Sequence, residues 1–180
     1  MKLENISIKN LAILISDHLR KNGVDTVLTG GACVTIYTRG RHISYDLDFV
    51  PLTSVDRRTL RTILEELGFE EEGRHFVHEG TQYFIEFIAP PLAVGEEPVK
   101  EIHSIKKGNK VLKLLSPTDC TKDRLAAYYH WNDRQSLEQA ILVCTYSDVD
   151  VIEVERWSKN EGMKNRFEVF RKLIGDKHSR

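Results

Sequence analysis

The sequence predicts an α+β fold, in which a β-sheet flanked by helices covers residues 1–115 and a helical region covers residues 116–180 and packs on it. Short runs rich in β-branched and aromatic residues, separated by turn residues, lie in the first part. From Ser116 onward, apolar residues recur at helical spacing instead. The chain has 180 residues, which is enough for a compact domain with a core of its own.

The predicted elements of residues 1–115 alternate between helices and strands. Glycines end the two longer helices at positions 23 and 68, because glycine adopts the backbone conformation that closes a helix. Thr53 is the predicted cap of the second of these helices, with Asp56 in its first turn. The elements are a helix over residues 6–22, a strand over 24–29, a short helix over 32–38, a strand over 43–50, a helix to Leu67, a hairpin of residues 74–78 and 82–88, a loop over 89–98, and a hairpin over 100–114.

The helical region begins with a clear capping sequence. Ser116 is the predicted N-cap, Pro117 suits the first helical position, and Asp119 lies in the first turn. This helix runs to about His130. Three more helices are predicted over residues 133–146, 150–161 and 163–174.

Composition is that of a soluble globular protein, with 41% hydrophobic and 29% charged residues and a formal net charge of −1. This balance gives no sign of a polyanionic partner. Three cysteines lie far apart and outside any CxxC spacing, which indicates reduced thiols. The N-terminus lacks the apolar core of a signal peptide, and no apolar run approaches a membrane span. We therefore expect a cytoplasmic protein with no membrane partner.

Two aspartates stand in the otherwise apolar run ISYDLDFV of residues 43–50. On a strand, Asp46 and Asp48 share one face about 6.6 Å apart, where two like charges repel. A divalent cation between them reverses that penalty, and Mg²⁺ prefers carboxylate oxygens together with substrate phosphates. The alternative is that both aspartates simply line the solvent side of a half-exposed strand.

Glu86 is the third acid of interest, because it lies in the apolar run QYFIEFI, where an unpaired charge is costly. If this strand pairs next to residues 43–50, Glu86 faces Asp46 and Asp48. Three such acids can hold two cations, one activating an attacking oxygen and one steadying a triphosphate. Taken alone, Glu86 also fits an edge-strand charge or an ion-pair partner.

A glycine pair, Gly30 and Gly31, lies between a predicted strand and a predicted helix. Glycine lets the backbone approach a ligand closely, and a helix N-terminus offers free N–H groups to an anion. The whole stretch GGACVTIYTRGRHISYDLDF resembles the signature of the DNA polymerase β-type nucleotidyltransferase superfamily. Within it, the chain is most similar to the AbiEii-like predicted bacterial nucleotidyltransferases. The resemblance covers about residues 24–90, and the segment SPTDCTKDRLAAYYHWNDRQSLEQA is similar to that group's downstream region.

The resemblance implies a nucleotidyltransferase-like mixed β-sheet and assigns roles to named residues. By it, Asp46, Asp48 and Glu86 are the catalytic, metal-binding acids, and the cofactor is Mg²⁺ or Mn²⁺. The nucleotide-binding residues that it implies are Gly30, Gly31, Arg39, Arg41, Ser44 and Lys122. Two departures stand out: Gly31 occupies a place where many active members have serine, and the third acid is Glu where Asp is commoner.

Lys122 lies in the helix that follows Ser116, beside Asp123 and Arg124. A lysine offers a point charge to phosphate, so we expect Lys122 to contact the triphosphate if this helix lines the cleft. The alternative is that Lys122 belongs to an ordinary solvated helix face.

Two functions follow from these patterns. The first is metal-dependent transfer of a nucleoside monophosphate from an NTP to an acceptor hydroxyl of an RNA end, a protein or a small molecule. The resemblance adds a toxin–antitoxin setting, with an antitoxin or a helical protein as partner. The second is a catalytically inactive module on the same fold that binds a nucleotide or a partner protein.

Overall fold

Seven strands within residues 3–178, the part of the chain that this computed structural model describes, form one mixed sheet in the order β3-β4-β5-β2-β1-β9-β8. The central pairs β2–β5 and β1–β9 are parallel, whereas the other neighbours are antiparallel. These strands are β1 (Thr26–Thr29), β2 (Asp46–Pro51), β3 (Glu70–Glu72), β4 (His75–Val77), β5 (Phe84–Phe87), β8 (Ile102–Lys107) and β9 (Lys110–Leu115). The predicted fold class is confirmed.

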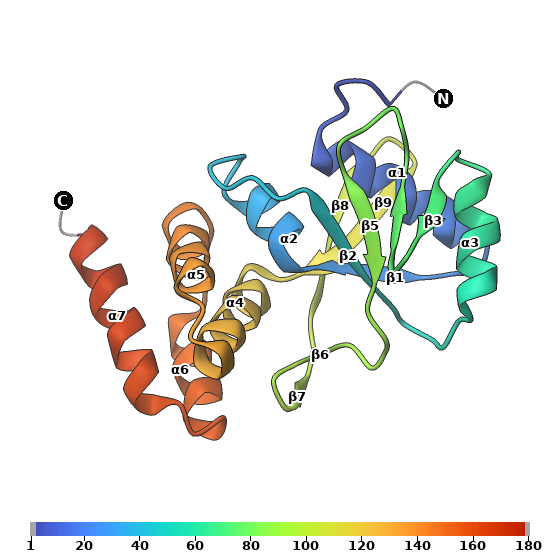
Figure 1. Ribbon diagram of the computed structural model, residues 1–180. Helices are drawn as coiled ribbons and strands as arrows, with labels where there is room; N and C mark the ends of the chain where they lie inside the picture. Colours follow the sequence, from blue (N-terminus) through green and yellow to red (C-terminus); the bar gives the residue numbers. More distant parts are fainter. Residues whose placement is uncertain (1–2, 179–180) are drawn as a thin grey trace.

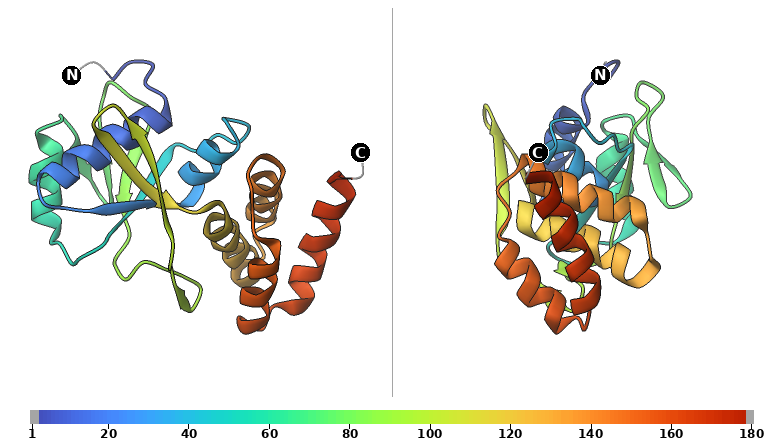
Figure 2. Two further views of the ribbon diagram at one scale, coloured as in Figure 1. Left: turned by 180° about the vertical axis from the view of Figure 1, so that it is seen from behind. Right: turned by 90° about the vertical axis from the view of Figure 1, so that its left-hand side faces the viewer.

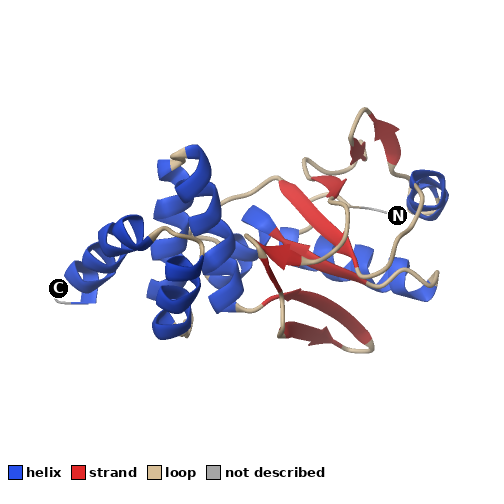
Figure 3. Ribbon diagram, turned by 90° about the horizontal axis from the view of Figure 1, so that it is seen from below, coloured by secondary structure: helices blue, strands red, loops and turns tan. Residues whose placement is uncertain are grey.

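Helices cover the sheet and continue beyond it. Helix α1 lies across the sheet and contacts β1, β9 and α3 (Figure 2), while α4 to α7 stand together to one side of the strands (Figures 1 and 3). The helices are α1 (Ile8–Lys21), α2 (Gly30–Tyr37), α3 (Arg57–Glu65), α4 (Pro117–Trp131), α5 (Arg134–Tyr146), α6 (Val151–Asn160) and α7 (Lys164–His178). Across residues 3–178, no helix is both long and apolar enough to cross a bilayer.

Most of the predicted helices and strands are present, and the differences between prediction and structure have local causes. Helix α3 begins at Arg57, because the Asp56 side chain, not that of Thr53, accepts the capping hydrogen bond from the N–H of Thr59. The predicted loop over residues 89–98 forms a small separate hairpin of β6 (Ala93–Val94) and β7 (Glu97–Pro98). Strand β3 was not predicted, since its sequence EEE has no apolar alternation.

Helix α2 connects the sheet with the C-terminal helices. It contacts β1 and β2 on one side and α4 and α5 on the other. Its buried residues, among them Ala32, Cys33 and Val34, join the same core as Leu125 of α4 and Leu137 of α5. One continuous apolar core therefore holds the C-terminal helices against the edge of the sheet from which β2 starts.

Candidate active site

The three predicted acids share one face of the sheet. Strands β2 and β5 are parallel neighbours, and Asp48 lies directly opposite Glu86 in their register. Directly opposed residues on adjacent strands project to the same face, and so do residues two apart on one strand. Asp46, Asp48 and Glu86 therefore belong to one acidic row that crosses two strands.

The arrangement disfavours the ionised form of Asp48. Burial, and then the neighbouring charges of Asp46 and Glu86, raise the pKa of the Asp48 carboxyl to about 6. Only Arg124 opposes the shift among the main contributors. The folded protein thus holds a carboxylate whose charge is poorly compensated, which is the environment that a bound cation would relieve.

The glycine pair lies directly against the acids. Gly30 is the first residue of α2 and has a φ of +65°, a conformation that favours glycine. A Cβ on Gly30 would stand 2.1 Å from Oδ2 of Asp48, well inside van der Waals contact. Residue 30 therefore has to be glycine for Asp48 to occupy its place.

The position of Ser44 explains why residue 31 is also glycine. A Cβ on Gly31 would stand 2.8 Å from Oγ of Ser44. The Ser44 hydroxyl also accepts a hydrogen bond from the N–H of Asp46 at 3.3 Å. A hydroxyl from the β2 side thus occupies the space that a serine at position 31 would need.

A polar cavity of about 320 Å³ opens beside these residues, between the start of β2 and helices α4 and α5. Its lining comes from both parts of the chain. The residues that line it are Gly31, His42, Ile43, Ser44, Tyr45, Asp46, Asp48, Arg124, Asp133, Gln135, Ser136 and Gln139. The site therefore exists only where the C-terminal helices pack against the sheet.

Arg124 is the cation of this cavity, and its guanidinium is held from two sides. Its Nε and Nη2 donate to Oδ2 of Asp123 at 3.0 and 2.6 Å. Its Nη1 donates to Oε1 of Gln139 on α5 at 3.3 Å. A fixed, mostly buried guanidinium next to carboxylates suits a phosphate group placed between them.

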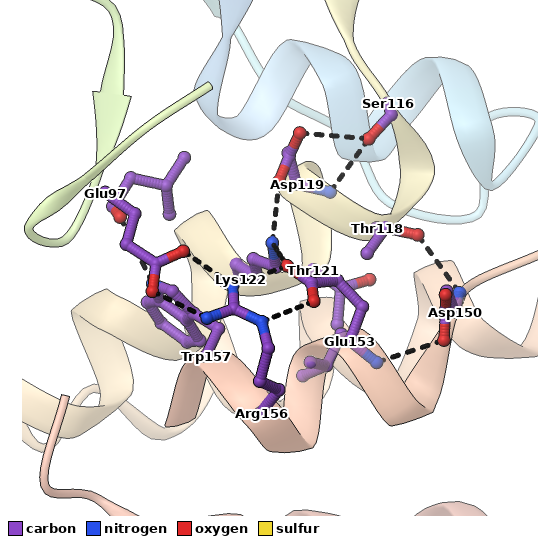
Figure 4. A network of polar contacts seen from close by, with 12 residues as sticks. Glu97, Ser116, Thr118, Asp119, Thr121, Lys122, Asp150, Glu153, Arg156 and Trp157 are labelled. Carbon is purple, nitrogen blue, oxygen red and sulfur yellow. Dashed lines mark hydrogen bonds and ion pairs between the residues drawn. The ribbon is translucent and has the colours of Figure 1, made fainter. Parts of the chain in front are cut away.

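Lys122 lies elsewhere. Figure 4 shows it in a separate polar network, where its Nζ is 2.8 Å from Oε1 of Glu153 and 3.1 Å from Oδ1 of Asp119. This network borders a different cavity of about 210 Å³, next to the β6–β7 hairpin. Two residues apart on a helix correspond to about 200° of rotation, so Lys122 and Arg124 face opposite ways. The structure does not bring Lys122 to the acids.

The two predicted loop arginines also stay outside the cavity lining. Arg39 is exposed in the turn after α2, with a φ of +53°. The guanidinium of Arg41 lies 4.4 Å from the ring centroid of Tyr146 on α5. The structure thus gives Arg41 a stacking contact that helps to fasten the loop onto the C-terminal helices.

Two of the three acids fit a divalent cation as they stand. Asp46 and Asp48 both line the cavity and offer the hard oxygen ligands that Mg²⁺ prefers. The Glu86 carboxylate instead lies 3.4 Å from Nε2 of His75 and 3.7 Å from Nε of Arg74. Among residues 3–178, no three His, Cys, Asp or Glu side chains are already gathered as a metal site. The aspartate pair fits a cation, whereas Glu86 would have to turn from His75 to join it.

Sequence reasoning missed His42, Arg124 and Gln139 as cavity residues. His42 lies in the loop before β2, and the other two lie on α4 and α5. On a helix, Arg124 points about 200° away from Lys122, so the sequence already showed that only one of the two could face the acids. His42 and Gln139 lie within the segments that carry the family resemblance, but the resemblance gives neither a role, and only the packing of α5 against the loop reveals them.

Comparison with known proteins supports the fold. No protein-family model matches the chain, and no curated protein matches it by sequence. An antigenic nucleotidyltransferase-like protein from Paracoccidioides brasiliensis has a similar structure, with a TM-score of 0.59 and 16% identity over 78% of this chain and 77% of that one. The antibiotic-resistance factor ANT(2'')-Ia aligns with a TM-score of 0.52 and 16% identity over 99% of both chains. By its architecture, therefore, the chain has a nucleotidyltransferase-like fold.

Proposed function

We propose that this protein is a metal-dependent nucleotidyltransferase, which moves a nucleoside monophosphate from an NTP to an acceptor hydroxyl and releases pyrophosphate. The observation that carries the proposal is the pair Asp46 and Asp48, which lines a polar cavity beside Gly30, with Glu86 on the same face of the neighbouring strand. The likeness of the fold to a nucleotidyltransferase-like protein supports the same reaction class.

Several residues of the cavity have a role in this proposal. Asp46 and Asp48 would hold Mg²⁺ or Mn²⁺, which supplies charge neutralisation for a triphosphate. Arg124 donates to the phosphates in place of the expected Lys122. Ser44 and the backbone N–H groups at the start of α2 face the same ligand.

Glu86 receives the proton of the acceptor hydroxyl. Its carboxylate lies on the same face of the sheet as that of Asp48 and is 3.4 Å from Nε2 of His75. A carboxylate within hydrogen-bond reach of the attacking hydroxyl is the group needed for this step.

The finer assignment is also part of the proposal. The GG and Asp-x-Asp pattern suggests an AbiEii-like bacterial enzyme of the cytoplasm, working with an antitoxin or a helical partner protein. The acceptor would be an RNA end, a protein or a small molecule. The second candidate, an inactive nucleotide- or partner-binding module, is favoured by the Glu86 side chain, because it is paired with His75 and not turned to the aspartates.

The test is incubation of the protein with each labelled NTP, Mg²⁺, total RNA and cell lysate, followed by detection of labelled product and pyrophosphate. Asp46→Asn and Asp48→Asn should each lower the rate by about 100-fold or more. Asp148→Asn, an exposed aspartate outside the cavity, is the matched control. Nucleotide binding without pyrophosphate release for any NTP would support the inactive module and overturn the enzyme.

A further inference from the structure

A chain of three side chains crosses the cavity from the C-terminal helices to the loop before β2. Nη1 of Arg124 is 3.3 Å from Oε1 of Gln139, and Nε2 of Gln139 is 3.3 Å from Nε2 of His42. All three residues line the cavity that holds Asp46 and Asp48. Gln139 is the middle member, and its side chain is buried, with 7% of the residue exposed.

The chemistry of arginine fixes the direction of every hydrogen bond in this chain. A guanidinium has donors and no acceptor, so the Gln139 atom that faces Arg124 must be the amide oxygen. The amide nitrogen of Gln139 then faces His42 and can only donate. Nε2 of His42 must therefore accept, which requires a neutral imidazole that carries its proton on Nδ1.

The loop that carries His42 is itself anchored. The N–H of His42 donates to Oγ1 of Thr38 at 3.3 Å, and the N–H of Ser44 donates to Oγ1 of Thr35 at 3.1 Å. Both acceptors belong to the α2 segment, one in the helix and one at its C-cap. The His42 ring thus meets Gln139 from a fixed backbone, and the contact depends on the hydrogen-bonding state of the ring.

We propose that Gln139 is a positioning residue of the nucleotide site, which aims Arg124 at the cavity and selects the neutral Nδ1–H form of His42. The inference rests on the proposed function for the role of Arg124, but the hydrogen-bond chain itself does not depend on any activity. A protonated His42 would place an N–H donor against the Gln139 amide donor, and the contact between the loop and α5 would be lost.

The charged groups around His42 shift its pKa in opposite directions. Burial lowers the pKa of His42, and the guanidinium of Arg124 on α4 lowers it further. Asp46 and Asp48 on β2 and Asp133 at the start of α5 line the same cavity and act in the opposite sense. The lowered pKa agrees with a His42 that serves as a neutral acceptor.

The experiment reads the His42 ring directly by ¹⁵N NMR and then measures nucleotide affinity. In the wild type at pH 8, Nε2 of His42 should show the shift of an unprotonated nitrogen. In Gln139→Glu, a carboxylate faces both neighbours, so Nε2 should carry the proton and the ring should titrate at higher pH than in the wild type. Glu138→Gln, an exposed neighbour outside the chain, should leave the His42 signals unchanged.

The second readout is the affinity of the protein for an NTP. At pH 8, Gln139→Met keeps the side-chain length and should weaken NTP binding about tenfold, because Nη1 of Arg124 loses its acceptor and only Asp123 still holds the guanidinium. The double variant Gln139→Met/Arg124→Met should bind no more weakly than Arg124→Met alone, since both changes remove one interaction.

Two results would overturn the inference. One is a wild-type His42 protonated on Nε2, or a ring that titrates identically in the wild type and in Gln139→Glu. The other is additive losses of affinity in the double variant. If the wild type binds no NTP, the proposed function fails, while the NMR result still decides whether Gln139 orders His42.

Discussion

Replacing Asp48 with Asn should stabilise the metal-free protein at neutral pH. The pKa of Asp48 rises from 3.8 to about 6 in the folded state, chiefly through burial and then through Asp46 and Glu86. A shift of about 2 units corresponds to about 3 kcal/mol of unfavourable free energy when the carboxyl is ionised. An amide at this position carries no charge and escapes that cost.

The sign of the pH dependence follows from proton binding. Between about pH 4 and pH 6 the folded protein binds more protons at Asp48 than the unfolded chain does, so wild-type stability falls as the pH rises through this range. The Asp48→Asn variant has no carboxyl at this position and so lacks this pH dependence. Its advantage should therefore be near zero at pH 3.5 and should reach about 3 kcal/mol at pH 7.5.

Urea denaturation in EDTA at several pH values measures this difference, with Asp148→Asn as the control. Adding Mg²⁺ should stabilise the wild type and leave Asp48→Asn unchanged, because the variant has lost a carboxylate ligand. A variant that is equally stable or less stable than the wild type at pH 7.5 would refute the reasoning.

The other predictions concern the glycines and the two cations of α4. Gly30→Ala should destabilise the fold by several kcal/mol, as followed by thermal unfolding, because its Cβ would overlap Asp48 and its φ is +65°. Gly31→Ser should lower the melting temperature, and adding Ser44→Gly should restore it, since the new side chain needs the Ser44 space. Equal melting temperatures for the single and double variants would contradict this. Lys122→Met should cost about 3 kcal/mol in urea denaturation, because it leaves the buried Asp119 without its cation and removes one of the two cations paired with Glu153, and should keep NTP affinity by calorimetry. Arg124→Met should lower NTP affinity about tenfold or more, because the cavity loses its guanidinium. A loss of affinity in Lys122→Met alone would restore the original expectation for that lysine.

Local sequence signals predicted the elements that depend on local chemistry. Ser116 caps α4 with its hydroxyl, and Pro117 occupies the first position, as the sequence indicated. The hairpin of β4 and β5 also appears where alternation and a tight turn placed it. Where two residues compete for one local role, the outcome was harder to foresee. Asp56 displaced Thr53 as the cap of α3 because its side chain reaches both the N–H and the hydroxyl of Thr59.

The site depends on strand pairing and helix packing between segments that are far apart in the sequence. The sequence indicated the acids at 46, 48 and 86 but not whether their strands are neighbours, and the parallel register of β2 with β5 settles that Asp48 stands opposite Glu86. The sequence also offered Lys122 and Arg124 as nearly equal cations. Only the packing of α4 against α5 and α6 turns one toward Gln139 and buries the other between Asp119 and Glu153.

By itself, the sequence determined the α+β class, the order of the main helices and strands, and the residue types that bear chemistry, because propensities, caps and alternation act over a few neighbouring residues. The tertiary structure alone decided the close approach of Gly30 to Asp48, the raised pKa of that acid and the chain through Gln139 to His42. Each of these depends on burial and on contacts between segments that lie far apart in the sequence, and no local pattern encodes such distances.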